Sequence, residues 1–122
     1  MFIIILNLMK NDFVHLHLHS QYSLLDGAIK FDELFDEVAR QGMSAVALTD
    51  HGNLFGAYDF YKLGKKNNIK PIIGCEVYIT RDRTKKTPEN NKTHHLTVLC
   101  MNIKGYENLC SLVSAGHLEG FY

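Results

Sequence analysis

Three histidines occupy alternate positions near the N-terminus, within the stretch FVHLHLHSQYSLLDG at residues 13–27. They are His15, His17 and His19, and apolar residues fill the positions between them. Alternate residues of a β-strand share one face, so a strand here would turn its imidazoles one way and its apolar side chains the other. The stretch alone therefore leaves two interpretations open, an amphipathic strand with a polar outer face or the beginning of a metal site.

The rest of the chain alternates between patterns typical of helices and of strands. Apolar residues at 31, 34, 35 and 38 recur with helical spacing, which predicts a helix over 31–41, and SAVALT at 44–49 is typical of a strand buried on both faces. We further predict a strand at 13–18, a helix at 55–67 with Phe55, Tyr58 and Leu63 inward, a strand at 71–79, an exposed loop at 81–92, a strand at 95–101 and a helix at 105–116. This order indicates an α/β fold built from parallel βαβ units.

The length of the chain, 122 residues, fits one small domain or part of a larger one. Because three or four parallel strands leave an unpaired edge, we expect 13–122 to be the first part of a longer barrel-like domain, incomplete at its C-terminus. We interpret residues 1–12 as an N-terminal extension. Its apolar run MFIIILNLM is too short for a membrane span, and Lys10 follows that run instead of preceding it as in a signal peptide. One hypothesis is that Met9 is the true start.

Charge and cysteine content exclude several classes of protein. The formal net charge is zero, so no overall basic field would hold nucleic acid. Basic residues do gather in the loop at 81–92, where a solvated flap is favoured over contact with DNA phosphates. The three cysteines are widely spaced and include no Cys-x-x-Cys, which argues against disulfides or a thiolate zinc site and favours the cytoplasm.

Polar residues mark the ends of the predicted strands. They are His17 and His19 after the first strand, Asp26 in the loop that follows it, Asp50 and His51 after the second strand, Glu76 in the third and His95 at the start of the fourth. Carboxyl ends of strands meet at one edge of an α/β sheet, so we expect the earlier members of this set to lie together. His95 reaches that edge only if its strand runs the other way.

This set of imidazoles and carboxylates is typical of a metal site. The predicted ligands are His17, His19, Asp26, His51, Glu76 and His95, which suit zinc, manganese or iron better than calcium. Six ligands exceed the needs of one tetrahedral ion, so we predict two or three ions bridged by Glu76 or Asp26. Such clusters activate water and bind both oxygens of a phosphoryl displacement.

Individual polar residues allow other interpretations. We assign catalytic roles to Asp50, His51 and Glu76. Asp50 alternatively caps the following helix or orients His51. We expect His15 to support the ligands, and His94 and His117 to be ordinary surface residues.

Five stretches together resemble the PHP (polymerase and histidinol phosphatase) family. They are FVHLHLHSQYSLLDGA, AVALTDHGNLFGAYDFY, KPIIGCEVYI, HHLTVLCMNIKGYENLCSLVSAG and EGFY, and they are most similar to the PHP domains that begin bacterial replicative polymerases of the polymerase III alpha type. The resemblance implies a distorted (β/α)7 barrel, of which this chain holds the first half, with a metal cluster at one rim. It also implies metal-dependent phosphoester hydrolysis, which serves as a 3′–5′ proofreading exonuclease in some members and is lost in others.

The resemblance also assigns roles to single residues. His17 and His19 match the His-x-His ligands, Asp26 the next acidic ligand, His51 the Asp-His ligand, Glu76 the bridging carboxylate and His95, which precedes Leu96, the His-Leu ligand. The remaining family ligands, a His or Cys and a late Asp-x-His, would lie beyond Tyr122, as would the polymerising domains that use magnesium. We therefore expect the isolated chain to be inactive.

The parent protein implied by the resemblance is a cytoplasmic DNA-directed DNA polymerase. Its expected partners are DNA and other holoenzyme subunits such as the sliding clamp, and no membrane. The alternatives are a catalytically inactive PHP platform that binds partner subunits and a free-standing PHP phosphatase.

Overall fold

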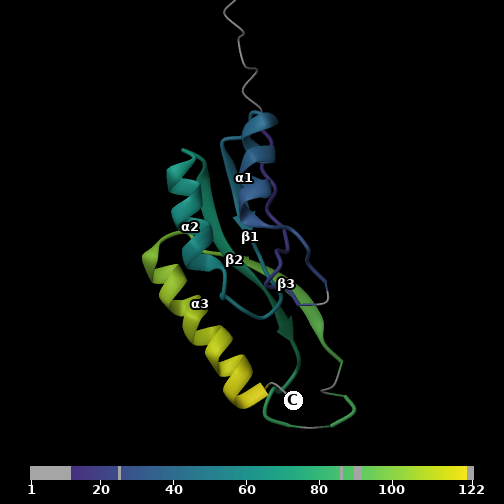
Figure 1. Cartoon of the computed structure of the whole chain (residues 1–122). Helices are drawn as coiled ribbons and strands as arrows, with labels where there is room; N and C mark the ends of the chain where they lie inside the picture. The colour runs from purple at the N-terminus through teal and green to yellow at the C-terminus, as the bar shows by residue number, and fades with distance from the viewer. Residues whose placement is uncertain (1–11, 25, 86, 90–91, 121–122) are drawn as a thin grey trace, which may run out of the picture.

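The computed structural model describes residues 12–24, 26–85, 87–89 and 92–120, which form a mixed α/β fold around a three-stranded sheet (Figure 1). The elements are α1 (Phe31–Arg40), β1 (Ala45–Leu48), α2 (Ala57–Lys66), β2 (Lys70–Ile79), β3 (His94–Leu99), α3 (Ile103–Ala115) and a π-helical turn, η1 (Gly116–Gly120). The predicted α/β class is thus confirmed. None of the helices in the described part of the chain is long and apolar enough to cross a membrane.

The central strand, β2, joins two different pairings. Its first part pairs in parallel with β1, from Lys70 to Ile73. Its second part, from Gly74 to Ile79, extends beyond the end of β1 and pairs antiparallel with β3. The prediction of parallel units throughout is therefore wrong for β3, which follows β2 through the irregular segment after Ile79 and returns alongside it.

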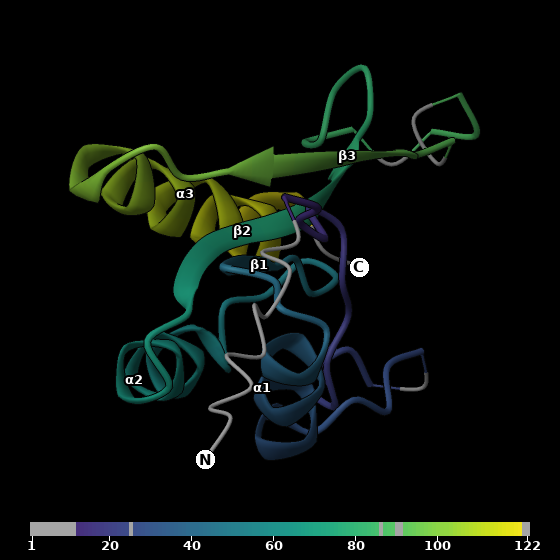
Figure 2. The same ribbon diagram turned by 90° about the horizontal axis from the view of Figure 1, so that it is seen from above.

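The apolar core lies between the sheet and the first two helices. The stripe predicted for α1 is buried, with acidic residues in the first turn of the helix, where they favour its start. The buried cluster consists of Phe31, Leu34, Phe35, Val38, Met43, Val46, Leu48, Phe60 and Ile69. In the view of Figure 2, β1 and β2 lie between α3 and the pair of helices α1 and α2. One face of this part of the sheet is thus covered by α1 and α2, and the other face by α3.

The segment predicted as the first strand, 13–18, is extended but is not a regular strand. It lies beside β1, where the amide of Ala47 donates to the carbonyl of His15 at 2.8 Å and the amide of Thr49 to the carbonyl of Leu18 at 2.9 Å. The amide of Leu18 donates to the side-chain Oγ1 of Thr49 at 2.8 Å. The backbone bonds to His15 and Leu18 are three residues apart in this segment but only two apart along β1, so the segment does not keep the register of a regular ladder.

The inward face of α2 differs in part from the prediction, since Leu63 packs against the core as predicted but the two aromatic residues do not. Phe55 and Tyr58 were predicted to face inward, yet they are 71% and 69% exposed. The helix begins at Ala57, and its buried side follows the helical spacing of Ala57, Phe60 and Gly64. A Cβ on Gly64 would come within 2.9 Å of the Pro71 ring, so glycine permits the close approach of α2 to β2.

Candidate metal centre

The carboxylate of Glu76 is at the centre of the candidate site. Glu76 lies in β2 and is only 3% exposed. Its Oε2 is 2.7 Å from Nε2 of His17 and 2.6 Å from Nε2 of His19, while its Oε1 accepts a hydrogen bond from Nδ1 of His95. Buried carboxylates are rare unless they are paired, and this one is surrounded by three imidazoles.

The charge of Glu76 follows from these contacts. Burial alone raises its pKa, but the hydrogen bonds with His17, His19 and His95 outweigh that effect, and the pKa falls to about 2. The side chain is therefore ionised at neutral pH. A buried anion surrounded by imidazole nitrogens is a suitable place for a cation.

A second part of the site joins the loop after the first segment to the end of β1. The Nε2 of His51 is hydrogen bonded to Oδ2 of Asp26. The same carboxylate oxygen is 3.7 Å from Nδ1 of His19, and the rings of His19 and His51 lie with their centroids 4.0 Å apart. His19 thus lies between Glu76 and Asp26.

The extra length of β2 positions Glu76 next to the residues that follow β1. Glu76 forms an isolated bridge with His51 and its amide donates to the carbonyl of Asp50 at 3.0 Å. The chain then turns away through Gly52, whose φ of 59° is left-handed, and the amide of Gly52 donates to the carbonyl of Glu76 at 2.9 Å. His51 is thereby held facing the cluster.

The antiparallel direction of β3 brings in His95. In the register of the hairpin His95 is opposite Tyr78, two residues beyond Glu76. Residues two apart in a strand share a face, so His95 points to the same side of the sheet as Glu76. The sequence required a strand of opposite direction for His95 to reach this edge of the sheet, and β3 does run antiparallel to β2.

Asp50 is buried and fastens the loop that carries the first ligands. Its carboxylate accepts hydrogen bonds from the amide of Ser20 at 2.7 Å, from the hydroxyl of Ser20 at 2.9 Å and from the hydroxyl of Ser23 at 2.6 Å. The alternative that Asp50 caps the following helix is wrong, because α2 has Gly56 at its N-cap and no side-chain cap. Its catalytic role stays a prediction.

The structure brings all six predicted ligands into one cluster. Their ligand atoms form three overlapping groups, each within 4.8 Å: His17, His19 and Glu76; His19, Asp26 and His51; and His51, Glu76 and His95. A neutral imidazole offers one lone pair, so His19 and His51 each serve one ion, whereas the two oxygens of Glu76 can bridge. The donor set fits zinc, manganese or iron.

Two further residues at this site were not found from the sequence. The ring of Tyr78 is stacked on that of His51. His117, predicted as ordinary surface, donates from Nε2 to the carbonyl of Gly52 at 2.7 Å. The two-residue spacing from Glu76 would have indicated Tyr78, but no local signal links His117 to a residue 65 positions away.

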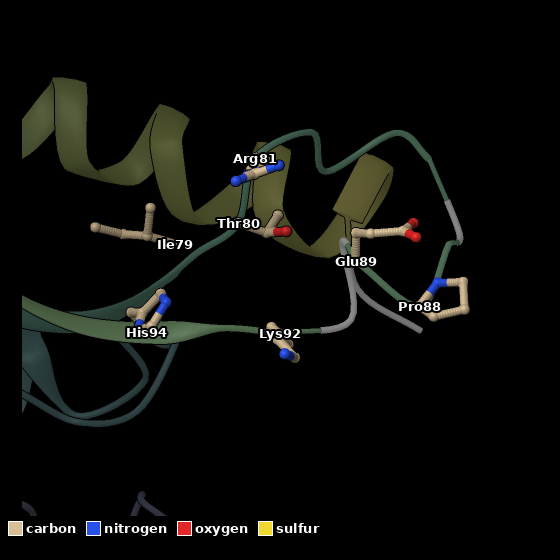
Figure 3. A pocket seen from close by; sticks show the side chains of 7 residues that line it. All are labelled: Ile79, Thr80, Arg81, Pro88, Glu89, Lys92 and His94. Atoms are coloured by element: carbon tan, nitrogen blue, oxygen red, sulfur yellow. The ribbon is translucent and has the colours of Figure 1, made fainter.

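The other histidines lie apart from the ligands. The ring of His15 packs edge-on against Phe13, with centroids 4.7 Å apart, so its predicted support of the ligands is indirect at most. His94 is exposed at the start of β3. It lines a separate hollow of about 590 Å³, and none of the six ligands lines that hollow (Figure 3). The other lining residues are Ile79, Thr80, Arg81, Pro88, Glu89 and Lys92.

Comparison with known proteins places the chain in a family. The PHP domain family matches residues 15–122. The chain belongs to the PHP domain family. As a PHP chain it is 52% identical over 122 residues to DNA polymerase III subunit alpha of Aquifex aeolicus (strain VF5), covering 93% of this chain and 10% of that protein. The same subunit of Helicobacter pylori (strain ATCC 700392 / 26695) is 53% identical over 110 residues, covering 90% of this chain and 9% of that one.

This PHP chain therefore spans about a tenth of the length of these curated relatives. Its fold is similar to that of a proposed metal-dependent phosphoesterase from Bifidobacterium adolescentis, with a TM-score of 0.54 and 17% identity. That match covers 80% of this chain and 31% of the other. At this identity the similarity shows the fold.

Proposed function

We propose that this chain is the N-terminal part of a replicative DNA polymerase subunit of the polymerase III alpha type, and that its PHP centre hydrolyses phosphodiesters. The identity of about half of the residues to two such subunits supports the first part. The buried carboxylate of Glu76 among three imidazoles supports the second. In this proposal residues 13–122 are the first part of a longer PHP domain.

The metal centre of this proposal holds two or three ions of zinc, manganese or iron. His17, His19 and His95 would hold ions together with Glu76, whose carboxylate has two oxygens to offer, and Asp26 and His51 would hold a further ion. Ions bound in this way supply an activated water at neutral pH and neutralise the charge of the phosphodiester.

The protein's own residues would prepare this chemistry. Ionised Glu76 lies 2.6 to 2.7 Å from the imidazoles of His17 and His19, so the ligands are already in place. Asp50 acts through the loop, because its bonds to Ser20 and Ser23 fix the chain between His19 and Asp26. We therefore propose that Asp50 is a positioning residue and that Glu76 and His51 contact the ions.

The whole protein would be a DNA-directed DNA polymerase of the cytoplasm. Its polymerising domains would use magnesium, and it would bind DNA and other holoenzyme subunits such as the sliding clamp. These activities rest on the names of the relatives, of which this chain covers about a tenth. The PHP centre would then remove nucleotides from a 3′ end.

One observation favours a second function, that of an inactive platform. The cluster joins the segment before Ser20, the end of β1, and both strands of the β2–β3 hairpin through one carboxylate. A metal at such a junction stabilises folding whether or not it performs chemistry. The platform differs from the enzyme in lacking hydrolysis.

Neighbouring histidines of β3 provide a matched test in the full-length protein. We expect His95→Ala to lower the content of bound metal by about one ion and the hydrolysis of a 3′-labelled single-stranded DNA at least tenfold, whereas His94→Ala, exposed beside it, leaves both unchanged. Metal content is measured by mass spectrometry and hydrolysis on gels. Equal behaviour of the two variants contradicts the proposed site. Metal binding that raises the unfolding temperature without any hydrolysis favours the platform.

A further inference from the structure

Tyr78 lies against two of the candidate ligands without belonging to any ligand group. It shares a face of β2 with Glu76 and is 48% exposed. Its ring is stacked on that of His51 at an interplanar angle of 17°, with centroids 6.0 Å apart. The ring of His95 meets it at 87°, with centroids 4.8 Å apart. Two rings thus hold the phenol in place.

The imidazole of His51 is close enough to serve either of two ligand groups. It belongs to one group with His19 and Asp26 and to another with Glu76 and His95. Its Nε2 is hydrogen bonded to Asp26, and its Nδ1 is 3.6 Å from Oε2 of Glu76. A neutral imidazole carries a proton on one nitrogen and a lone pair on the other. The neighbour that accepts the proton therefore decides which nitrogen binds an ion.

The hydroxyl of Tyr78 is the nearer acceptor for a proton on Nδ1 of His51. It lies 3.4 Å from that nitrogen, towards the long end of hydrogen-bond distances. The competing oxygen of Glu76 is 3.6 Å away and already bonded to His17 and His19. Tyr78 thus has the shorter contact with Nδ1 of His51.

We propose that Tyr78 is a positioning residue for His51: when an ion replaces the proton between Nε2 of His51 and Asp26, the imidazole proton moves to Nδ1, and the hydroxyl of Tyr78 accepts it there. This inference rests on the proposed metal centre. In this arrangement His51 binds an ion together with Asp26, and Glu76 and His95 bind another ion without it.

A double-mutant cycle in the full-length protein tests this role, with Mn²⁺ alone as the probe. We expect Tyr78→Phe, which keeps the ring and removes the hydroxyl, to weaken Mn²⁺ binding about 10- to 100-fold at one site. Tyr58→Phe, on the exposed side of α2, should leave binding unchanged. In a His51→Gln background, Tyr78→Phe should cause no further loss, because the partner through which it acts is gone.

Free Mn²⁺, measured by electron paramagnetic resonance, gives the binding constants. Unchanged affinity in Tyr78→Phe, or an equal loss with and without His51→Gln, overturns the proposal for Tyr78 while the metal centre stands. A parent protein that binds Mn²⁺ no better than a His17→Ala variant overturns the metal centre itself. The unfolding temperature of each metal-free variant separates loss of a ligand position from loss of folding.

Discussion

The two parts of the sheet differ in how they are held. Around β1 the structure is apolar: all four residues of this strand are buried, and Phe35 and Phe60 are at most 1% exposed. Around β3 and α3 the apolar residues lie largely in solvent, with Met101 96% and Ile103 73% exposed. The ligands lie where these two regions meet. Apolar packing therefore supports one side of the site, and polar contacts support the other.

β2 is the element on which both regions depend. It pairs with β1 through its first residues and carries Glu76 and Tyr78 in the part that extends towards β3. Each region can therefore be weakened separately, and the consequences for folding should differ.

The largest effect is expected from truncation in the apolar region. Phe60→Ala removes a fully buried ring and should lower the free energy of unfolding by about 3–5 kcal/mol, because a cavity remains in the core. Leu112→Ala, on α3 and 51% exposed, should cost less than about 1 kcal/mol. Urea denaturation of the two variants measures both. Similar losses would show that the two regions are equally packed.

A smaller effect is expected where the regions meet. Asp50→Asn removes a buried negative charge that accepts three hydrogen bonds, and we expect a loss of about 1–3 kcal/mol of unfolding free energy. Asp59→Asn, exposed on α2, is the control and should change little. If Asp50 is a positioning residue, the variant also weakens metal binding. Normal stability combined with loss of hydrolysis would favour a direct catalytic role instead.

The smallest effect concerns the thiols. Burial raises the pKa of Cys75 to about 11, and its thiol donates to the carbonyl of Asp50. Because the raised pKa belongs to the folded state, this contribution to stability is full below about pH 9 and is lost as the pH rises towards 11. At pH 8, iodoacetamide should label the partly buried Cys110 well before Cys75. Peptide mass spectrometry reads the order, and early labelling of Cys75 would contradict its burial.

Local patterns predicted the elements that apolar spacing determines. The apolar stripe predicted α1, and the apolar run predicted β1, with boundaries that differ from the structure by one residue at most at each end. The segment at 13–18 fails as a strand because its contacts with β1 change register: the bonds to His15 and Leu18 are three residues apart in the segment but two apart along β1. For α2, two exposed aromatic residues, Phe55 and Tyr58, suggested the wrong face. In both cases a tertiary contact outweighed the local pattern.

The residue types of the site were predictable, but parts of its geometry were not. Imidazoles and carboxylates at strand ends indicated a cluster, and the structure places them together. The approach of His95 depends on the direction of β3, which the sequence left open. The contact of His117 with Gly52 joins distant segments and has no counterpart in local sequence.

The central claim is that Glu76 and the surrounding imidazoles form one metal centre. Anomalous X-ray diffraction from crystals of the full-length protein grown with Mn²⁺ or Zn²⁺ tests it most directly. We expect anomalous peaks within about 2.0–2.3 Å of the Glu76 carboxylate and of the nitrogens of His17 and His19. An anomalous map without peaks around Glu76 at saturating metal would contradict the account.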